Sequence, residues 1–128
     1  MMQPAPTEGE LAILRVLWGR GAPMTVREVH EVLQRDKTTA YTTVLKMLTI
    51  MLEKGLVLRD ESERSHRFVP SYTETVVESS LVDNFVQHTL GGSAVKLVQR
   101  ALDAGRASHD ELDEIAKLIA DAKRRVRR

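Results

Sequence analysis

The sequence predicts a mainly α-helical fold that carries one small β-hairpin. Capping sequences, and apolar residues spaced three and four apart, recur along most of its 128 residues, as is typical of amphipathic helices. Aromatic residues make up only 4% of the chain, so the core must be aliphatic, and this composition favours helices over a β-sandwich. Two short apolar runs that flank one polar turn predict the hairpin.

The first two helices are predicted from the residues that precede them. Thr7 and Glu10 have the spacing of a capping box, in which the threonine accepts from the backbone and the glutamate reaches back to it. The helix that they begin is expected to end near Gly21. Thr25 and Glu28 have the same spacing and predict a second, shorter helix.

The third helix and the hairpin follow directly. The helix is expected from about Ala40 to Lys54, where Gly55 ends it. At about 100° per residue, its apolar residues fall within one arc that should be buried: Tyr41, Val44, Leu45, Leu48, Met51 and Leu52. The runs 56–59 and 66–69 then predict two strands, joined by the polar turn 60–65.

Three more helices are predicted beyond the hairpin, separated by glycines. Ser71 to Glu74 form a third capping box, whose helix runs to about Leu90 and is broken by Gly91-Gly92. A short helix is expected from Ser93 to about Ala104. The last helix begins at Ser108, in a fourth capping box.

The order of three helices and a hairpin is that of a winged helix-turn-helix domain, in which the third helix keeps one face free. We therefore predict a DNA-binding domain at residues 1–71 and a helical dimerisation region at residues 72–128. The free face suits a DNA major groove, because residues 37–52 contain no acid and threonine hydroxyls and methyls can contact base edges. The candidate DNA-binding residues are Thr38, Thr39, Tyr41, Thr42, Thr43 and Lys46 around the third helix, and Arg64, His66 and Arg67 on the hairpin. The alternative interpretation is a threonine-rich face that is only solvated.

Four stretches of the sequence carry a resemblance to the penicillinase-repressor family, of the BlaI/MecI type. They are Thr7–Trp18, Met24–Leu33, Ala40–Val57 and the wing segment His66–Pro70. The resemblance implies a homodimeric repressor whose winged domain binds operators with two-fold symmetry and whose C-terminal helices make the dimer. It also implies relief of repression by a protease, at a position that corresponds to about Arg100-Ala101. The Asn-Phe pair that relatives carry at the cut is not matched there.

The C-terminal third is expected to supply the dimer contacts. Apolar residues of the last helix alternate by three and four, which suits pairing with another helix. The candidate dimerisation residues are Val77, Leu81, Phe85, Leu112, Ile115, Ile119, Ala122 and Val126. Packing of these residues within the same chain is the alternative.

Several function classes are excluded. The chain has no cysteine, which excludes disulfides and thiolate metal sites, and its four histidines stand on different predicted elements without metal-ligand spacing. We therefore expect no enzyme, no cofactor and no metal. No apolar run is long enough to span a membrane and no signal peptide is visible, so a cytoplasmic protein is expected.

The charge balance leaves a second function open. The formal net charge is +1, and the first 70 residues hold ten Lys and Arg against nine Asp and Glu. Any DNA binding must therefore come from local arrangement, and a winged-helix module that binds a protein remains the alternative. A sensor of small molecules is less favoured, because no polar and aromatic cluster can be recognised in the C-terminal region.

Overall fold

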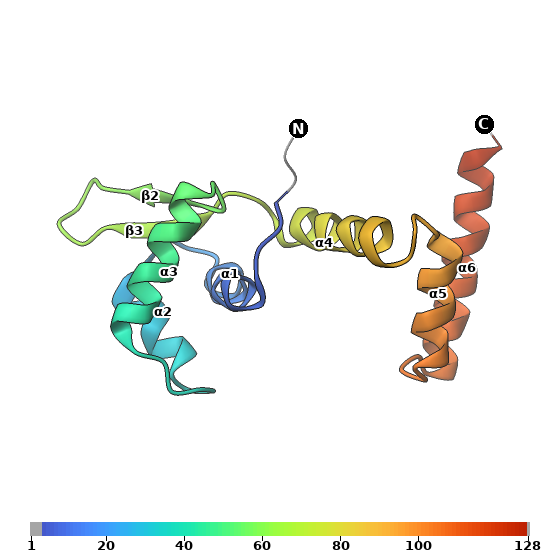
Figure 1. The fold of residues 1–128 in the computed structure, drawn as a ribbon, viewed down its shortest axis with the longest axis horizontal. Helices are drawn as coiled ribbons and strands as arrows, with labels where there is room; N and C mark the ends of the chain where they lie inside the picture. Colours follow the sequence, from blue (N-terminus) through green and yellow to red (C-terminus); the bar gives the residue numbers. More distant parts are fainter. Residues whose placement is uncertain (1–3, 128) are drawn as a thin grey trace. The chain divides into compact units, whose positions relative to one another are not determined.

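The computed structural model describes residues 4–127, and it is mainly helical with one small antiparallel sheet, as predicted (Figure 1). Its elements in chain order are α1 (Glu8–Arg20), β1 (Met24–Thr25), α2 (Val26–Leu33), α3 (Tyr41–Glu53), β2 (Val57–Asp60), β3 (Arg67–Pro70), α4 (Glu74–Thr89), α5 (Ala94–Asp103) and α6 (His109–Val126). The chain divides into two compact units, Met1–Asn84 and Phe85–Arg128. The predicted domain boundary after residue 71 stays a prediction, because α4 extends from the first unit into the second.

The capping boxes of α1 and α2 form as the sequence indicates. The Thr7 side chain accepts from the Glu10 backbone N–H, and the Glu10 carboxylate accepts from the Thr7 N–H at 2.8 Å. Thr25 and Glu28 repeat this arrangement. Both helices therefore begin at the predicted residue, and α1 ends against Gly21 in the left-handed conformation.

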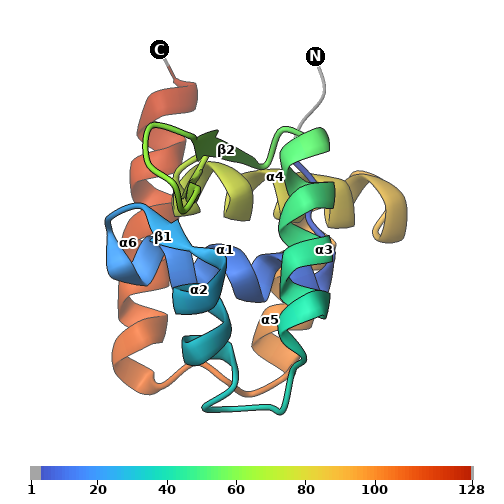
Figure 2. The same ribbon diagram turned by 90° about the vertical axis from the view of Figure 1, so that its left-hand side faces the viewer.

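The core of the first unit is mainly aliphatic and joins all of its elements. Residues of α1, α2 and α3 pack with residues of the sheet, among them the aromatic Phe68, and with Val77 and Leu81 of α4. The side chains with the least exposure are Ile13, Leu14, Leu17, Met24, Val29, Val44, Leu48, Met51, Val57 and Val77. This packing holds α3 across α1, with α2 beside it (Figure 2).

The buried face of α3 is narrower than the arc predicted for it. Val44, Leu48 and Met51 are fully buried, whereas Tyr41 is 44% exposed and Leu45 is 43% exposed. The expectation of burial was therefore wrong for these two residues. Leu45 lies at the edge of the arc and Tyr41 at the first turn of α3, and both line a cavity together with residues of β1, α2 and the hairpin.

The end of α3 is fixed by a Schellman motif that also begins the wing. Gly55 has a φ of 79°, the Gly55 N–H donates to the Leu52 carbonyl, and the Leu56 N–H donates to the Met51 carbonyl at 2.9 Å. Leu56 and Met51 are both buried, which supplies the apolar contact of this motif. The chain therefore leaves the helix in one defined direction.

The sheet contains a strand that the sequence did not reveal. Its order is β1-β3-β2, and β1 pairs Met24 with Phe68 and Thr25 with Arg67. The pairing of β2 with β3 confirms the predicted hairpin. Two residues are too short to show an alternating pattern, so β1 gave no signal of its own.

The cap of α4 differs from the prediction. The Thr73 hydroxyl, not that of Ser71, accepts from the Val76 N–H. Ser71 still belongs to the sheet region, because its N–H donates to the Leu56 carbonyl. The helix consequently begins at Glu74.

The second unit contains the predicted helices α5 and α6. Ser93 caps α5, and Ser108 forms the predicted capping box with Glu111 at the start of α6. No residue of α5 or of α6 as described is buried. Acidic residues begin α6 and basic residues end it, which complements the helix dipole, although Arg128 lies outside the described residues.

Candidate nucleic-acid interface

The outward face of α3 presents the predicted threonines. Thr42, Thr43 and Lys46 are exposed, on the side away from the buried stripe. Thr38 is also exposed in the connection before the helix, whereas Thr39 is half-buried there. These positions give α3 a hydroxyl-bearing surface with one cation near its centre.

A cavity of about 450 Å³ separates α3 from the hairpin. It brings together three of the predicted residues, namely Tyr41 of α3 and Arg64 and His66 of the hairpin turn. Its other lining residues are Thr25, Val26, Arg27, Leu45, Thr49, Arg59, Ser65 and Phe68. The predicted residues Thr42, Thr43, Lys46 and Arg67 do not line it.

Two lining cations escaped the sequence reasoning. Arg27, near the start of α2, and Arg59, in β2, are far apart in the sequence but line the same cavity. The residues beside each of them in the sequence give no sign of a binding site. Only the tertiary fold brings the two side chains to one cavity. The cavity lining contains no acidic residue.

The arginines on and around this cavity differ in whether they already form an ion pair with an acidic residue. Arg59 Nη2 lies 2.6 Å from Glu61 Oε1, and Arg67 Nη2 lies 3.4 Å from Glu63 Oε2. Within residues 4–127, Arg27 and Arg64 take part in no ion pair shorter than 4.0 Å. These two side chains are therefore the cations of the cavity that can meet a phosphate without first losing an acidic partner.

The hairpin turn is ordered by its own acidic residue. The Asp60 carboxylate accepts from the Ser62 N–H at 2.9 Å, and this backbone hydrogen bond lowers the pKa of Asp60. The carboxylate is thus held ionised at the base of the turn. It gives the turn a fixed shape while adding a negative charge beside the basic residues.

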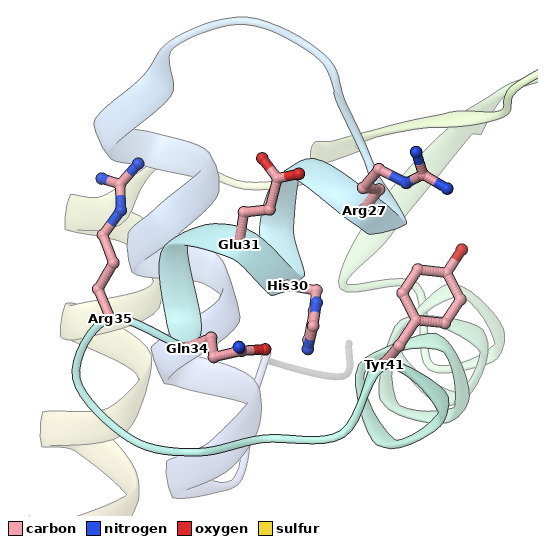
Figure 3. A pocket seen from close by; sticks show the side chains of 6 residues that line it. All are labelled: Arg27, His30, Glu31, Gln34, Arg35 and Tyr41. Atoms are coloured by element: carbon pink, nitrogen blue, oxygen red, sulfur yellow. The ribbon is translucent and has the colours of Figure 1, made fainter.

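A second cavity, of about 750 Å³, lies between α2 and the start of α3 (Figure 3). The His30 side chain extends from α2, and its Nε2 atom lies 2.7 Å from the Thr39 carbonyl oxygen in the connection before α3. Its ring meets the Tyr41 ring edge-on at 5.8 Å. His30 therefore ties the connection before α3 to α2 and holds the Tyr41 ring. The other residues that line this cavity are Arg27, Glu31, Gln34 and Arg35.

An ion pair between a buried carboxylate and an exposed lysine lies at the other end of α3. Lys54 Nζ lies 2.7 Å from Oε1 of Glu10, whose side chain is 6% exposed. Burial raises the pKa of Glu10, but the hydrogen bond from Lys54 and those from Thr7 outweigh it, so the pKa lies below its ordinary value. The pair links the first turn of α1 to the end of the exposed helix.

In the second unit, the predicted dimerisation residues have different surroundings. Phe85, Leu112, Ile119 and Val126 are exposed, and Ile115 and Ala122 are half-buried. Phe85 and Ile115 line one cavity of about 490 Å³.

Two predicted dimerisation residues belong instead to the first unit. Val77 is 1% exposed within the core of that unit, and Leu81 is half-buried against the same core. Their apolar contacts are therefore made inside their own unit.

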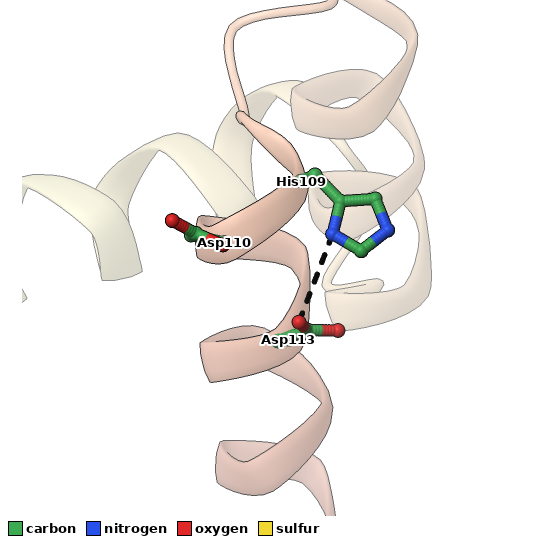
Figure 4. Close-up of side chains that lie close together, drawn as sticks. All are labelled: His109, Asp110 and Asp113. Carbon is green, nitrogen blue, oxygen red and sulfur yellow. Dashed lines mark ion pairs between the residues drawn. The ribbon is translucent and has the colours of Figure 1, made fainter.

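One polar cluster stands at the start of α6 (Figure 4). Ligand atoms of His109, Asp110 and Asp113 lie within 4.8 Å of one another, and His109 Nδ1 is 3.7 Å from Asp113 Oδ2. All three side chains are exposed at the first turn of the helix. Such exposed acidic groups complement the helix N-terminus, and they need no ion to explain them.

No helix among the described residues is long and apolar enough to cross a membrane.

Comparisons with known proteins agree with this geometry. The family model described as penicillinase repressor matches residues 6–121. The transcriptional regulator BlaI of Mycobacterium tuberculosis is 34% identical over 113 residues, which cover 88% of this chain and 80% of that protein.

Solved structures show the same fold at lower identity. The solution structure of the monomeric form of Bacillus licheniformis BlaI in complex with the blaP half-operator has a TM-score of 0.51 and 23% identity, covering 59% of this chain and 90% of that one. The RosR structure of H. salinarum has a TM-score of 0.51 and 17% identity, covering 92% of this chain and 94% of that one. The predicted winged-helix fold is thereby confirmed. The chain belongs to the penicillinase repressor family, and it is a BlaI-like transcriptional repressor with a DNA-binding winged helix rather than an enzyme.

Proposed function

We propose that two copies of this chain bind an operator with two-fold symmetry and repress transcription by covering the promoter. Each copy places the outward face of α3 in a major groove, and its hairpin contacts the flanking backbone. The observation that carries this proposal is the face of Thr42, Thr43 and Lys46, exposed beside a cavity that is lined by cations and no acid. Half-sites about 10 base pairs apart, centre to centre, would place both copies on one side of the duplex.

The unpaired apolar surface of α5 and α6 supports association of two copies. Val95 is 75% exposed and Leu118 is 64% exposed, and the two helices together line an apolar cavity of about 580 Å³. Apolar surface of this kind, without a buried partner in its own unit, is typical of an interaction site. Linking two binding domains can raise avidity by about 10²–10⁴ when both engage.

Relief of repression is proposed to follow cleavage of the second unit, in the cytoplasm of a bacterium. Arg100 and Ala101, at the position implied by the family resemblance, are exposed on α5. Cutting there would separate α6 from the DNA-binding unit and remove the avidity of the pair. Mass spectrometry of the protein recovered before and after induction tests this, and an intact chain after induction would contradict it.

Selection of bound duplexes from a random pool tests the central proposal. The expected result is one enriched sequence with two-fold symmetry, bound by two copies as measured by sedimentation. An enriched sequence without symmetry would contradict the dimer. No enriched sequence at all would favour the alternative, a winged-helix module that binds a protein.

The salt dependence of binding tests which cations meet phosphate. Replacing Lys46 or Arg27 by alanine should reduce the slope of log K against log salt by about 1 each. Arg15 is the matched control, because it is exposed on α1, away from the cavity beside α3, and its removal changes the net charge equally. Equal slopes for all three variants and the parent would place the DNA-binding surface elsewhere.

A further inference from the structure

Leu45 stands exposed in the middle of α3, next to the basic cavity. It is 43% exposed, and it lines the cavity together with Tyr41 and Thr49, which lie one turn to either side. Helical spacing of four places these three residues in one stripe along the edge of α3 that faces the hairpin. The leucine is therefore the aliphatic member of a stripe that is otherwise aromatic and hydroxylic.

The neighbouring side chains are engaged in other contacts. The Tyr41 ring is held edge-on by His30, and the Thr49 hydroxyl donates to the Leu45 carbonyl within the helix at 2.8 Å. The Leu45 side chain has no polar atom to engage, and it is 43% exposed. It is thus the exposed aliphatic side chain of the stripe, suited to pack on an apolar group of a ligand.

The charges around Leu45 favour a ligand that carries negative charge. Arg27 and Arg64 border the same cavity, from α2 and from the hairpin turn, and the lining holds no acid. Two other cavities of the first unit that basic residues line each include an acidic residue, Glu31 in one and Asp36 in the other. A phosphodiester strand is therefore most favoured at the cavity beside Leu45.

A strand held there would bring base edges to Leu45. With the backbone against Arg27 and Arg64, the bases of that strand extend toward α3, where the major-groove edge of thymine carries a methyl group. We propose that Leu45 is a specificity-determining residue that packs on the methyl group of one thymine in each half-site. This inference rests on the proposed operator binding, and it adds an apolar contact from the hairpin-facing edge of α3 to the contacts proposed for the threonine face.

Ile50 provides the matched control within the same helix. It is 39% exposed, close to the exposure of Leu45, but five residues later it lies about 140° around the helix and does not line the cavity. It also stands in the C-terminal half of α3, whereas base contacts from such helices come from the N-terminal residues. Truncating either side chain removes a similar aliphatic surface.

Removal of single methyl groups from the DNA tests the proposal. In the selected operator, each thymine of one half-site is replaced in turn by deoxyuridine, which keeps the base pair and loses only the methyl. The parent protein should bind about fourfold more weakly at one position, the effect of one buried methyl-sized group. Leu45→Ala should bind the thymine and uracil forms of that position equally, while Ile50→Ala should keep the fourfold difference.

A second measurement uses the parent protein with a modified DNA, so its result does not depend on how the variants fold. Bromine resembles a methyl group in size, so bromodeoxyuridine at the sensitive position should restore parent affinity. Irradiation should then cross-link the DNA to the peptide that contains Leu45, as identified by mass spectrometry. A cross-link to another segment, or a uracil penalty that persists in Leu45→Ala, would overturn the assignment.

The outcomes also separate this inference from the proposed function. A selected operator that shows no uracil-sensitive thymine would overturn the role of Leu45 and leave the repressor proposal standing. Failure to select any sequence would overturn both.

Discussion

Replacing Glu10 by glutamine tests whether the ion pair between this buried carboxylate and Lys54 stabilises the winged helix. The amide keeps the size of the side chain and can still accept from the Thr7 N–H, so the main loss is the charge that faces Lys54 Nζ at 2.7 Å. Hydrogen bonds to charged groups contribute about 1.5–3 kcal/mol, and the partial exposure of Lys54 reduces this to about 1–2 kcal/mol. For a unit of this size, each kcal/mol lowers the melting temperature by about 4–8 °C.

The direction of the Glu10 pKa shift determines how the stabilisation depends on pH. The pKa of Glu10 is lower in the folded protein than in the unfolded chain, where it is about 4.3. The stabilisation is therefore fully present above that value and is lost as the pH falls through the folded-state pKa. The difference between the parent and Glu10→Gln should be constant near neutral pH and should disappear in acid.

The single tryptophan supplies the assay. Trp18 lies on α1 and its indole N–H donates to the Tyr72 carbonyl at 3.0 Å, so its fluorescence reports unfolding of the first unit. Glu8→Gln is the control, because Glu8 is an exposed acid in the same first turn and makes no ion pair with Lys54. Equal melting temperatures for the two variants, or a difference that persists at pH 2, would refute the role of the pair.

Three further predictions concern a glycine, the α5–α6 surface and one threonine. Gly55→Ala should destabilise the first unit by about 1 kcal/mol because its φ is 79°, whereas Gly19→Ala, within α1 and with open space around it, should be neutral or stabilising by thermal melting. Val98→Asp combined with Ile119→Asp should shift the protein from dimer to monomer in sedimentation while the tryptophan melting transition is unchanged, and a persistent dimer would contradict the proposed interface. Thr43→Ala should broaden the base preference at one operator position without changing the salt slope, and an unchanged preference in repeated selection would exclude that contact.

Features that depend on neighbouring residues in the chain could be predicted from the sequence. The caps at Thr7 and Thr25 formed as expected because each box spans only four residues. The hairpin and the exposed threonine face were predicted for the same reason. Strand β1 could not be, since Met24 finds its partner Phe68 far along the chain.

Features that depend on tertiary neighbours escaped prediction. Helical periodicity placed Leu45 within an apolar arc, but only the position of the hairpin decides that this edge of the arc stays exposed. In the same way, Arg27 of α2 and Arg59 of β2 line one cavity only because the tertiary fold brings them to it. The DNA-binding and dimerisation residues themselves remain predictions until variants are measured.

The absence of buried residues in α5 and α6 as described has a consequence for how operator occupancy depends on the amount of this protein in the cell. If these helices gain their cover only when two copies meet, their folding and the meeting of the copies form one equilibrium. Operator occupancy would then rise more steeply than in proportion to the amount of protein made. A fall in synthesis, or a nick in this region, would then lower operator occupancy by more than the fall in intact protein.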